Sequence, residues 1–118
     1  AQRIGVEFHL KALDFPQTQK YIEHRLKMAG APRKIFSYQA CAIIYCYSEG
    51  VPRRINNLCD FAMVYAFSDD KKTVQVKTVL AMMADKNASK IIKPSESELP
   101  AVTKVKKWLS DKYDISLV

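Results

Sequence analysis

The sequence predicts a mainly α-helical protein, and three observations support that prediction. Apolar residues recur at the three- and four-residue spacing of amphipathic helices in successive segments of the chain. Glycine, proline and N-capping residues fall between these segments, where helices end and begin. A hydrophobic fraction of 48% in 118 residues is enough for a core without disulfides or metals. We therefore expect a small four-helix bundle with a short N-terminal strand and an extra C-terminal helix.

A short strand is expected at the start of the chain. Residues 4–10 alternate apolar side chains with polar or small ones, which is the period of a half-buried strand. The sequence begins in this pattern without a methionine. We therefore expect the strand to be the edge of a sheet that belongs to a longer parent protein.

The first helix is expected to begin after Asp14. Asp14 can cap it, Gln17 completes a capping box, and Pro16 suits the first turn. Gly30 is a typical helix stop. The residues expected on its buried face are Thr18, Ile22, Leu26 and Ala29.

The second helix is expected to be the centre of the bundle. Ser37 is its candidate N-cap, Phe36 stands where a hydrophobic staple would lie, and residues 40–47 are apolar almost all round. Gly50 closes this segment and Pro52 opens a third helix. The expected buried stripe of the third helix is Ile55, Leu58, Cys59, Ala62 and Ala66.

Two more helices complete the predicted fold. A polar turn precedes a fourth helix over about residues 75–85. Ser97 is the expected N-cap of the last helix, which places Pro100 in its first turn and extends to about residue 113. The apolar residues that support these two helices are Val76, Val79, Leu80 and Met83, then Val102, Val105, Trp108 and Leu109.

Net charge, cysteines and histidines bear on which ligands and metals the chain could bind. A net charge of +7 and a pI near 9.4 allow contact with phosphates, nucleic acid or an acidic membrane face and select none of them. The 3 cysteines contain no Cys-x-x-Cys pair, which favours small buried side chains in a reducing cytoplasm. His9 and His24 lack metal-ligand spacing, so we expect no metal. No apolar run reaches the roughly 20 residues of a membrane span, so we expect a soluble chain.

The sequence lacks the motifs of an independent enzyme. Its 3 glycines do not form a phosphate-binding loop, so neither Walker A nor Walker B chemistry is expected within these residues. No Ser-His-Asp, Cys-His or paired-carboxylate arrangement has a recognisable local context. We do not expect this chain to catalyse a reaction alone.

Arg53 and Arg54 form the most informative local pattern. Both stand in the first turn of the expected third helix. A helix N-terminus attracts anions, and a guanidinium can hold phosphate oxygens with paired hydrogen bonds. The two residues are therefore candidates for sensing a nucleotide phosphate. The competing interpretation is that they are ordinary solvated surface charges.

Three segments resemble AAA+ ATPases of the general secretion pathway protein A group. Residues 50–60, Gly-Val-Pro-Arg-Arg-Ile-Asn-Asn-Leu-Cys-Asp, resemble the sensor-2 motif of that group. Residues 2–10 resemble the close of the ATPase core, and residues 21–30 resemble the first helix of the lid subdomain. The resemblance covers about residues 2–85. It implies a cofactor-binding role for Arg53 as sensor-2 arginine and for Arg54 as helper or surface charge, and it implies that Arg3 is a candidate arginine finger.

The resemblance also implies an organisation and a function. Residues 1–12 would end the ATPase core, residues 13–86 would form the AAA+ lid bundle, and residues 87–118 would be a linker and C-terminal helix. The lid would close over ATP or ADP, with Mg held by the missing core, and would couple hydrolysis to assembly or transport work in secretion or pilus biogenesis. The parent, not this chain alone, would be the ATPase, and no nucleotide is expected to bind the chain tightly.

The implied partners are the N-terminal core of the same chain, neighbouring subunits of a homo-oligomer, and membrane components of a secretion or pilus machine. The expected location is cytoplasmic, with the parent associated with the inner membrane. One alternative is the lid of a DNA-transposition or replication-type ATPase, whose basic face would contact DNA. Another is a plain helical interaction module in which the Pro-Arg-Arg turn is accidental.

Overall fold

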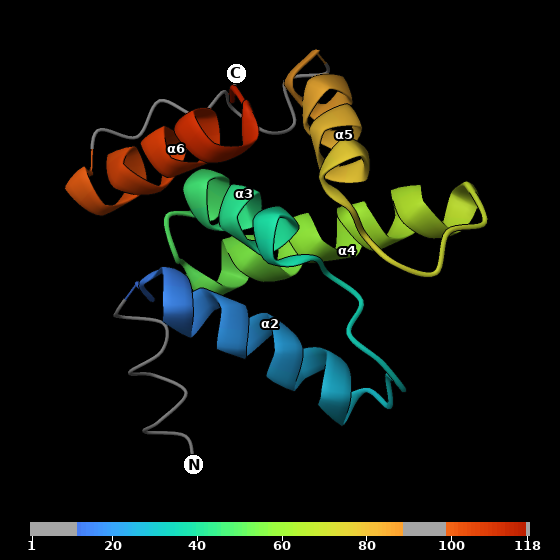
Figure 1. Ribbon diagram of the computed structural model, residues 1–118. Helices are drawn as coiled ribbons and strands as arrows, with labels where there is room; N and C mark the ends of the chain where they lie inside the picture. Colours follow the sequence, from blue (N-terminus) through green and yellow to red (C-terminus); the bar gives the residue numbers. More distant parts are fainter. Residues whose placement is uncertain (1–11, 89–98, 118) are drawn as a thin grey trace.

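The computed structural model describes residues 12–88 and 99–117, and within these ranges it contains five α-helices and no strand (Figure 1). The mainly helical class predicted from the sequence is confirmed. The strand predicted over residues 4–10 lies outside the described residues. The helices are α2 (Phe15–Met28), α3 (Tyr38–Ser48), α4 (Pro52–Ser68), α5 (Val76–Ala88) and α6 (Pro100–Tyr113).

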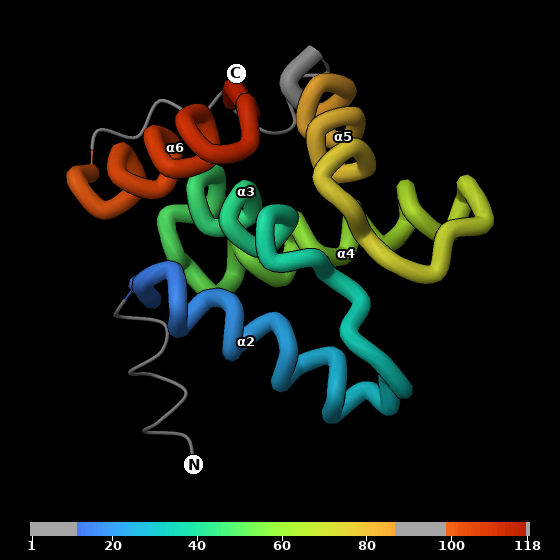
Figure 2. Tube along the Cα trace, in the orientation of Figure 1, coloured from blue at the N-terminus to red at the C-terminus, as the bar shows by residue number. Residues whose placement is uncertain are grey.

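Helix α3 is the centre of the structure, and each of the other four helices packs against it (Figures 1 and 2). Every residue from 40 to 46 is at most 3% exposed. A helix that is apolar all round is stable in water only when neighbours cover every side. The four surrounding helices provide that cover, as the sequence of residues 40–47 predicts. Helix α6 therefore shares one hydrophobic core with the other helices, to which it contributes Val102 and Leu109.

The predicted caps of α2 and α3 are confirmed. The Gln17 backbone N–H donates to Asp14 Oδ1 at 2.8 Å, and the Asp14 N–H donates to Gln17 Oε1 at 2.9 Å. The Ala40 N–H donates to Ser37 Oγ at 3.1 Å. The prediction that Ala29 is buried is wrong, because α2 ends one residue earlier and Ala29 is its exposed C-cap.

The later helices agree with the sequence in their buried faces and differ at their ends. All five residues of the predicted stripe of α4 are buried. Helix α5 extends to Ala88, beyond the predicted end, and buries Met82 in addition to Val79 and Met83. The prediction that Ser97 caps α6 is wrong, since Leu99 occupies the N-cap and Pro100 is the first helical residue. Proline is favoured at that position because its missing N–H has no intrahelical partner to lose.

Two backbone contacts join segments that are distant in the sequence. The loop before α3 pairs with the loop before α5, where the Val74 N–H donates to the Ile35 carbonyl at 2.7 Å. The Leu13 N–H donates to the Gly50 carbonyl at 2.8 Å, so the chain enters α2 beside the turn between α3 and α4. Gly50 has a φ of +78°, and a Cβ at this position would overlap the Leu13 carbonyl. Only glycine satisfies both conditions.

The three cysteines are free and buried, as the sequence predicts. Burial raises the pKa of Cys41 and of Cys46 from the ordinary 9.0 to about 12, and it raises the pKa of Cys59 as well. These side chains therefore behave as small apolar groups at neutral pH.

Gly50→Ala is expected to lower the free energy of unfolding by about 3 kcal/mol, since it combines left-handed backbone strain with loss of the Leu13 hydrogen bond. Gly30→Ala is the matched control, because Gly30 has a φ of +91° but open space around it. The control should lose only about 1 kcal/mol from backbone strain. Urea unfolding followed by circular dichroism measures both, and equal losses would contradict the proposed close approach.

The buried thiols predict a loss of stability at alkaline pH. The thiols of the unfolded chain ionise near pH 9.0, whereas those of Cys41 and Cys46 in the folded chain ionise near 12. The unfolded state therefore releases protons first, and each thiol lowers the free energy of unfolding by up to about 1.4 kcal/mol per pH unit above pH 9. Urea unfolding from pH 8 to 10 should show a shallower decline for Cys46→Ala than for the unchanged chain. Equal slopes would contradict this account.

Candidate functional site

Arg53 and Arg54 stand in the first turn of α4, and the structure separates them by their partners. Arg54 Nη1 lies 3.2 Å from Glu49 Oε1, which belongs to the C-cap residue of α3. The Arg53 side chain is exposed, and within residues 12–88 and 99–117 no ion pair restrains it. Arg53 is thus the arginine that can reach a group supplied from outside this chain.

The start of α4 is electrostatically unfavourable as it stands. Its N-cap is Val51, which offers no side-chain acceptor to the free backbone N–H groups, whereas Asp14 and Ser37 cap α2 and α3. Its first turn contains no acidic residue. Arg54 is offset by its pairing with Glu49, whereas the Arg53 cation at the positive end of the helix dipole opposes it by about 0.3 to 1 kcal/mol. A bound anion would satisfy the N–H groups and offset the charge of Arg53.

The first turn of α4 lies close to Leu13, near the start of the described residues. The hydrogen bond from Leu13 to Gly50 places residues 12–14 next to the turn that leads into α4 (Figure 2). Leu13 is buried there. Residues 12–14 therefore lie close to the helix start that carries Arg53.

A polar seam holds α4 against α2 one turn beyond the arginines. Tyr21 Oη donates to Asn56 Oδ1 at 2.9 Å in a partly buried contact. One turn further along both helices, Arg25 Nη1 lies 3.9 Å from Asp60 Oδ1, an exposed ion pair that contributes little by itself. The Tyr21–Asn56 bond fixes the rotation of α4 relative to α2, and so it determines the direction in which the first turn of α4 faces.

Sequence reasoning missed this seam and the Glu49–Arg54 pair. Helical spacing alone does not show which polar residues meet across two helices, so neither contact could be predicted from it. The signal that could have indicated the seam is the four-residue spacing of Tyr21 and Arg25, matched by the same spacing of Asn56 and Asp60.

One predicted site residue, Arg3, remains, together with two other features considered from the sequence: a metal site and a membrane-spanning helix. Arg3, the candidate arginine finger, lies outside the described residues and stays a prediction. In the part of the chain that the structure describes, no group of three or more His, Cys, Asp or Glu side chains could hold a metal ion. Across the same residues, no helix combines the length and apolar character needed to cross a bilayer.

Comparison with known proteins gives a partial match. The chain is similar to the general secretion pathway protein A of Aeromonas hydrophila, with 38% identity over 68 residues. This match covers 58% of the chain and 12% of that protein. No protein-family model matches the chain, and no solved structure matches it. The chain thus shares a sequence region with a secretion pathway protein and spans a small part of that protein's length.

Asn56→Ala tests the seam, with the adjacent exposed Asn57→Ala as its matched control. Loss of the partly buried bond to Tyr21 should lower the free energy of unfolding by about 1 kcal/mol, and the control should change it by less than about 0.5 kcal/mol. Urea unfolding of both variants measures the difference. A loss at Asn57 as large as that at Asn56 would show that the bond does not hold α4.

Proposed function

We propose that residues 13–86 form the lid subdomain of an AAA+ ATPase, and that Arg53 contacts the terminal phosphate of a nucleotide held by a preceding core. The observation that carries the proposal is the exposed Arg53 at a helix start that has no side-chain cap and no acidic residue in its first turn. The sensor-2 resemblance of residues 50–60 and the partial similarity to a general secretion pathway protein A support it. The core would supply the Walker motifs and Mg.

The contacts around Arg53 provide a route from phosphate to movement. A charge-assisted hydrogen bond to the terminal phosphate is present before hydrolysis and lost after it. Because the Tyr21–Asn56 bond joins α4 to α2, a force on the start of α4 also acts on α2. Leu13 in turn joins the beginning of α2 to the turn before α4. The helices would therefore move against the core as one body, which is a hinge type of domain closure.

The other two arginines receive different roles in this proposal. Arg54, paired with Glu49, would orient the first turn of α4 and contact phosphate only if that pair opened. Arg3 would act as an arginine finger toward nucleotide in a neighbouring subunit of a homo-oligomer. The parent would be a cytoplasmic ATPase associated with the inner membrane, and its work would be assembly or transport in secretion or pilus biogenesis. The corresponding DNA-transposition or replication lid would use Arg53 in the same way.

Arg53→Ala in the full-length parent is expected to lower ATP turnover about 10- to 100-fold, the effect of losing one charge-assisted hydrogen bond of about 1.5 to 3 kcal/mol. In the 118-residue chain the same change should raise the free energy of unfolding by about 0.3 to 1 kcal/mol, because it removes a cation from the positive end of α4. Lower ATP turnover together with a higher free energy of unfolding would distinguish a functional residue from a structural one.

Arg33→Ala is the matched control, since Arg33 is an exposed arginine in the loop between α2 and α3. It should leave both ATP turnover and stability nearly unchanged. Phosphate release assays on the parent and urea unfolding of the chain measure the two effects. ATP turnover in Arg53→Ala equal to that of the unchanged parent would remove Arg53 from the nucleotide site.

A further inference from the structure

A carboxylate stands at the start of α4, beside the proposed phosphate site. Glu49 Oε1 accepts a hydrogen bond from Arg54 Nη1 at 3.2 Å. Glu49 is the C-cap residue of α3 and Arg54 is the third residue of α4, so the pair bridges the turn between the two helices. The nucleotide contact proposed for Arg53 gives this carboxylate no role.

A strained and firmly held backbone presents Glu49. Its φ of +55° and ψ of +25° lie in the left-handed region, which favours glycine. The Glu49 N–H donates to the Tyr45 carbonyl at 2.8 Å, and the buried Ser48 Oγ accepts the Gly50 N–H at 3.1 Å. Strain of this kind persists only where the surrounding structure holds it, and it directs attention to the side chain at that position.

The unpaired backbone N–H groups at the start of α4 belong to the two arginines. The first four N–H groups of an α-helix have no helical acceptor, and here they would come from residues 51–54. The Val51 N–H donates to a carbonyl of the preceding turn at 3.1 Å, and Pro52 has no N–H. An anion at this helix end would therefore meet the N–H groups of Arg53 and Arg54 and could also contact both guanidinium groups.

The Glu49–Arg54 pair is weak enough for a phosphate to open. The side chain of Arg54 is 57% exposed and that of Glu49 is 32% exposed. An ion pair at such a position changes an equilibrium about fivefold at most. A charge-assisted hydrogen bond to a phosphate changes it about 10- to 100-fold. A terminal phosphate at the start of α4 would thus outcompete the Glu49 carboxylate for Arg54.

We infer that Glu49 competes with the terminal phosphate of the nucleotide for Arg54, an inference that rests on the nucleotide site proposed above. When the triphosphate is bound, Arg54 leaves Glu49 and joins Arg53 on the terminal phosphate. When that phosphate has left, the carboxylate takes Arg54 back. Glu49 is therefore a positioning residue that lowers the affinity for the triphosphate and favours release of the phosphate product.

The test measures equilibrium binding of ADP and of a non-hydrolysable ATP analogue to the full-length parent by isothermal titration calorimetry. Glu49→Gln removes the charge and keeps the size of the side chain. It should tighten binding of the analogue about three- to fivefold, because Arg54 no longer has to leave a carboxylate. It should change the affinity for ADP less than twofold. Unchanged or weaker binding of the analogue would overturn the inference.

Arg54→Ala separates competition for Arg54 from a general loss of negative charge. Alone, it should weaken binding of the analogue about 2- to 20-fold, which is the loss of the phosphate contact less the gain from not breaking the pair. Combined with Arg54→Ala, Glu49→Gln should change the affinity for the analogue less than twofold. Tightening that persists without Arg54 would be a long-range charge effect and would overturn the inference, as would full affinity in Arg54→Ala alone.

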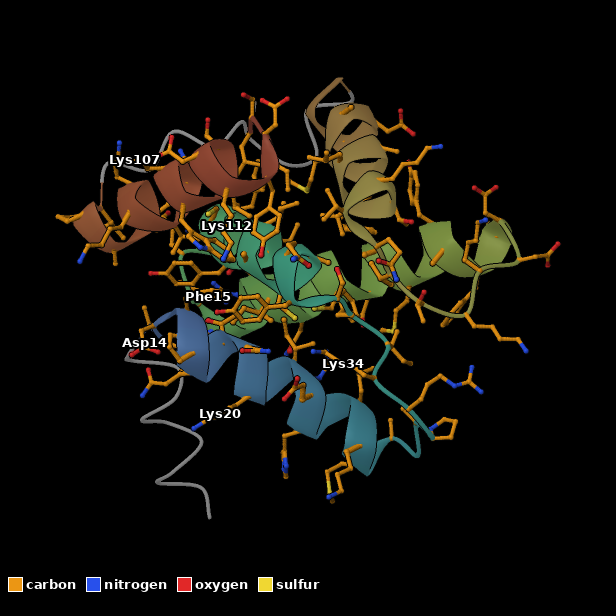
Figure 3. The ribbon with its side chains drawn as sticks, in the orientation of Figure 1. Asp14, Phe15, Lys20, Lys34, Lys107 and Lys112 are labelled. Carbon is orange, nitrogen blue, oxygen red and sulfur yellow. The ribbon has the colours of Figure 1, made fainter. Side chains whose placement is uncertain are left out.

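Glu23→Gln is the matched control, because it makes the same chemical change in another exposed ion pair. Glu23 Oε2 lies 3.9 Å from Lys34 Nζ. Figure 3 shows Lys34 well apart from Asp14, which marks the end of α2 beside the turn before α4. The control should change the affinity for both nucleotides less than twofold. Equal tightening by Glu23→Gln and Glu49→Gln would overturn the inference, since it would reflect net charge alone.

The same titration of Arg53→Ala distinguishes this inference from the proposed function. Weaker binding of the analogue to Arg53→Ala, with no effect of Glu49→Gln, would overturn the inference and leave the role of Arg53 standing. Tightening by Glu49→Gln, with unchanged binding to Arg53→Ala, would support competition for Arg54 and make Arg54 the phosphate sensor. No effect of either variant would overturn both. Circular dichroism of the 118-residue chain confirms that each variant is folded.

Discussion

Complete burial of α3 is the constraint on which the rest of the structure depends. Residues 40–46 have almost no polar side chains, so every side of this helix must be covered by apolar groups from other helices. Each neighbour meets that requirement with one apolar stripe and leaves its opposite side to water. The charged surfaces are consequences of this arrangement, because the outward sides of α2, α4 and α6 are free to carry charges.

Polar contacts between helices differ from the apolar core in where they lie and in what they fix. The apolar core fixes the distances between helices but is less selective about rotation, since many packings of similar volume are nearly equivalent. The Leu13–Gly50 and Tyr21–Asn56 hydrogen bonds are directional, and both lie near the first turn of α4. These two bonds therefore orient the helices close to Arg53, whereas the Val74–Ile35 and Tyr65–Asp85 bonds join other parts of the structure.

Local signals accounted for most of the secondary structure. The capping box of Asp14 and Gln17 and the cap at Ser37 were predictable because each acts over three residues. Helix ends without such a signal were less predictable. Ala29 fitted the apolar spacing of α2 but lies one residue past the end of that helix. At α6 the helix begins with Pro100, so its N-cap is Leu99 and not Ser97.

The sequence by itself determined which segments are helical, that α3 is central, and that Arg53 stands at the start of a helix. Only the tertiary structure decided that Glu49 holds Arg54, that Tyr21 meets Asn56, and that α6 completes an aromatic groove. Helical periodicity and capping are set by residues a few positions apart, so a sequence displays them directly. Contacts between helices depend on rotation and crossing geometry, which arise only when all the stripes are buried together.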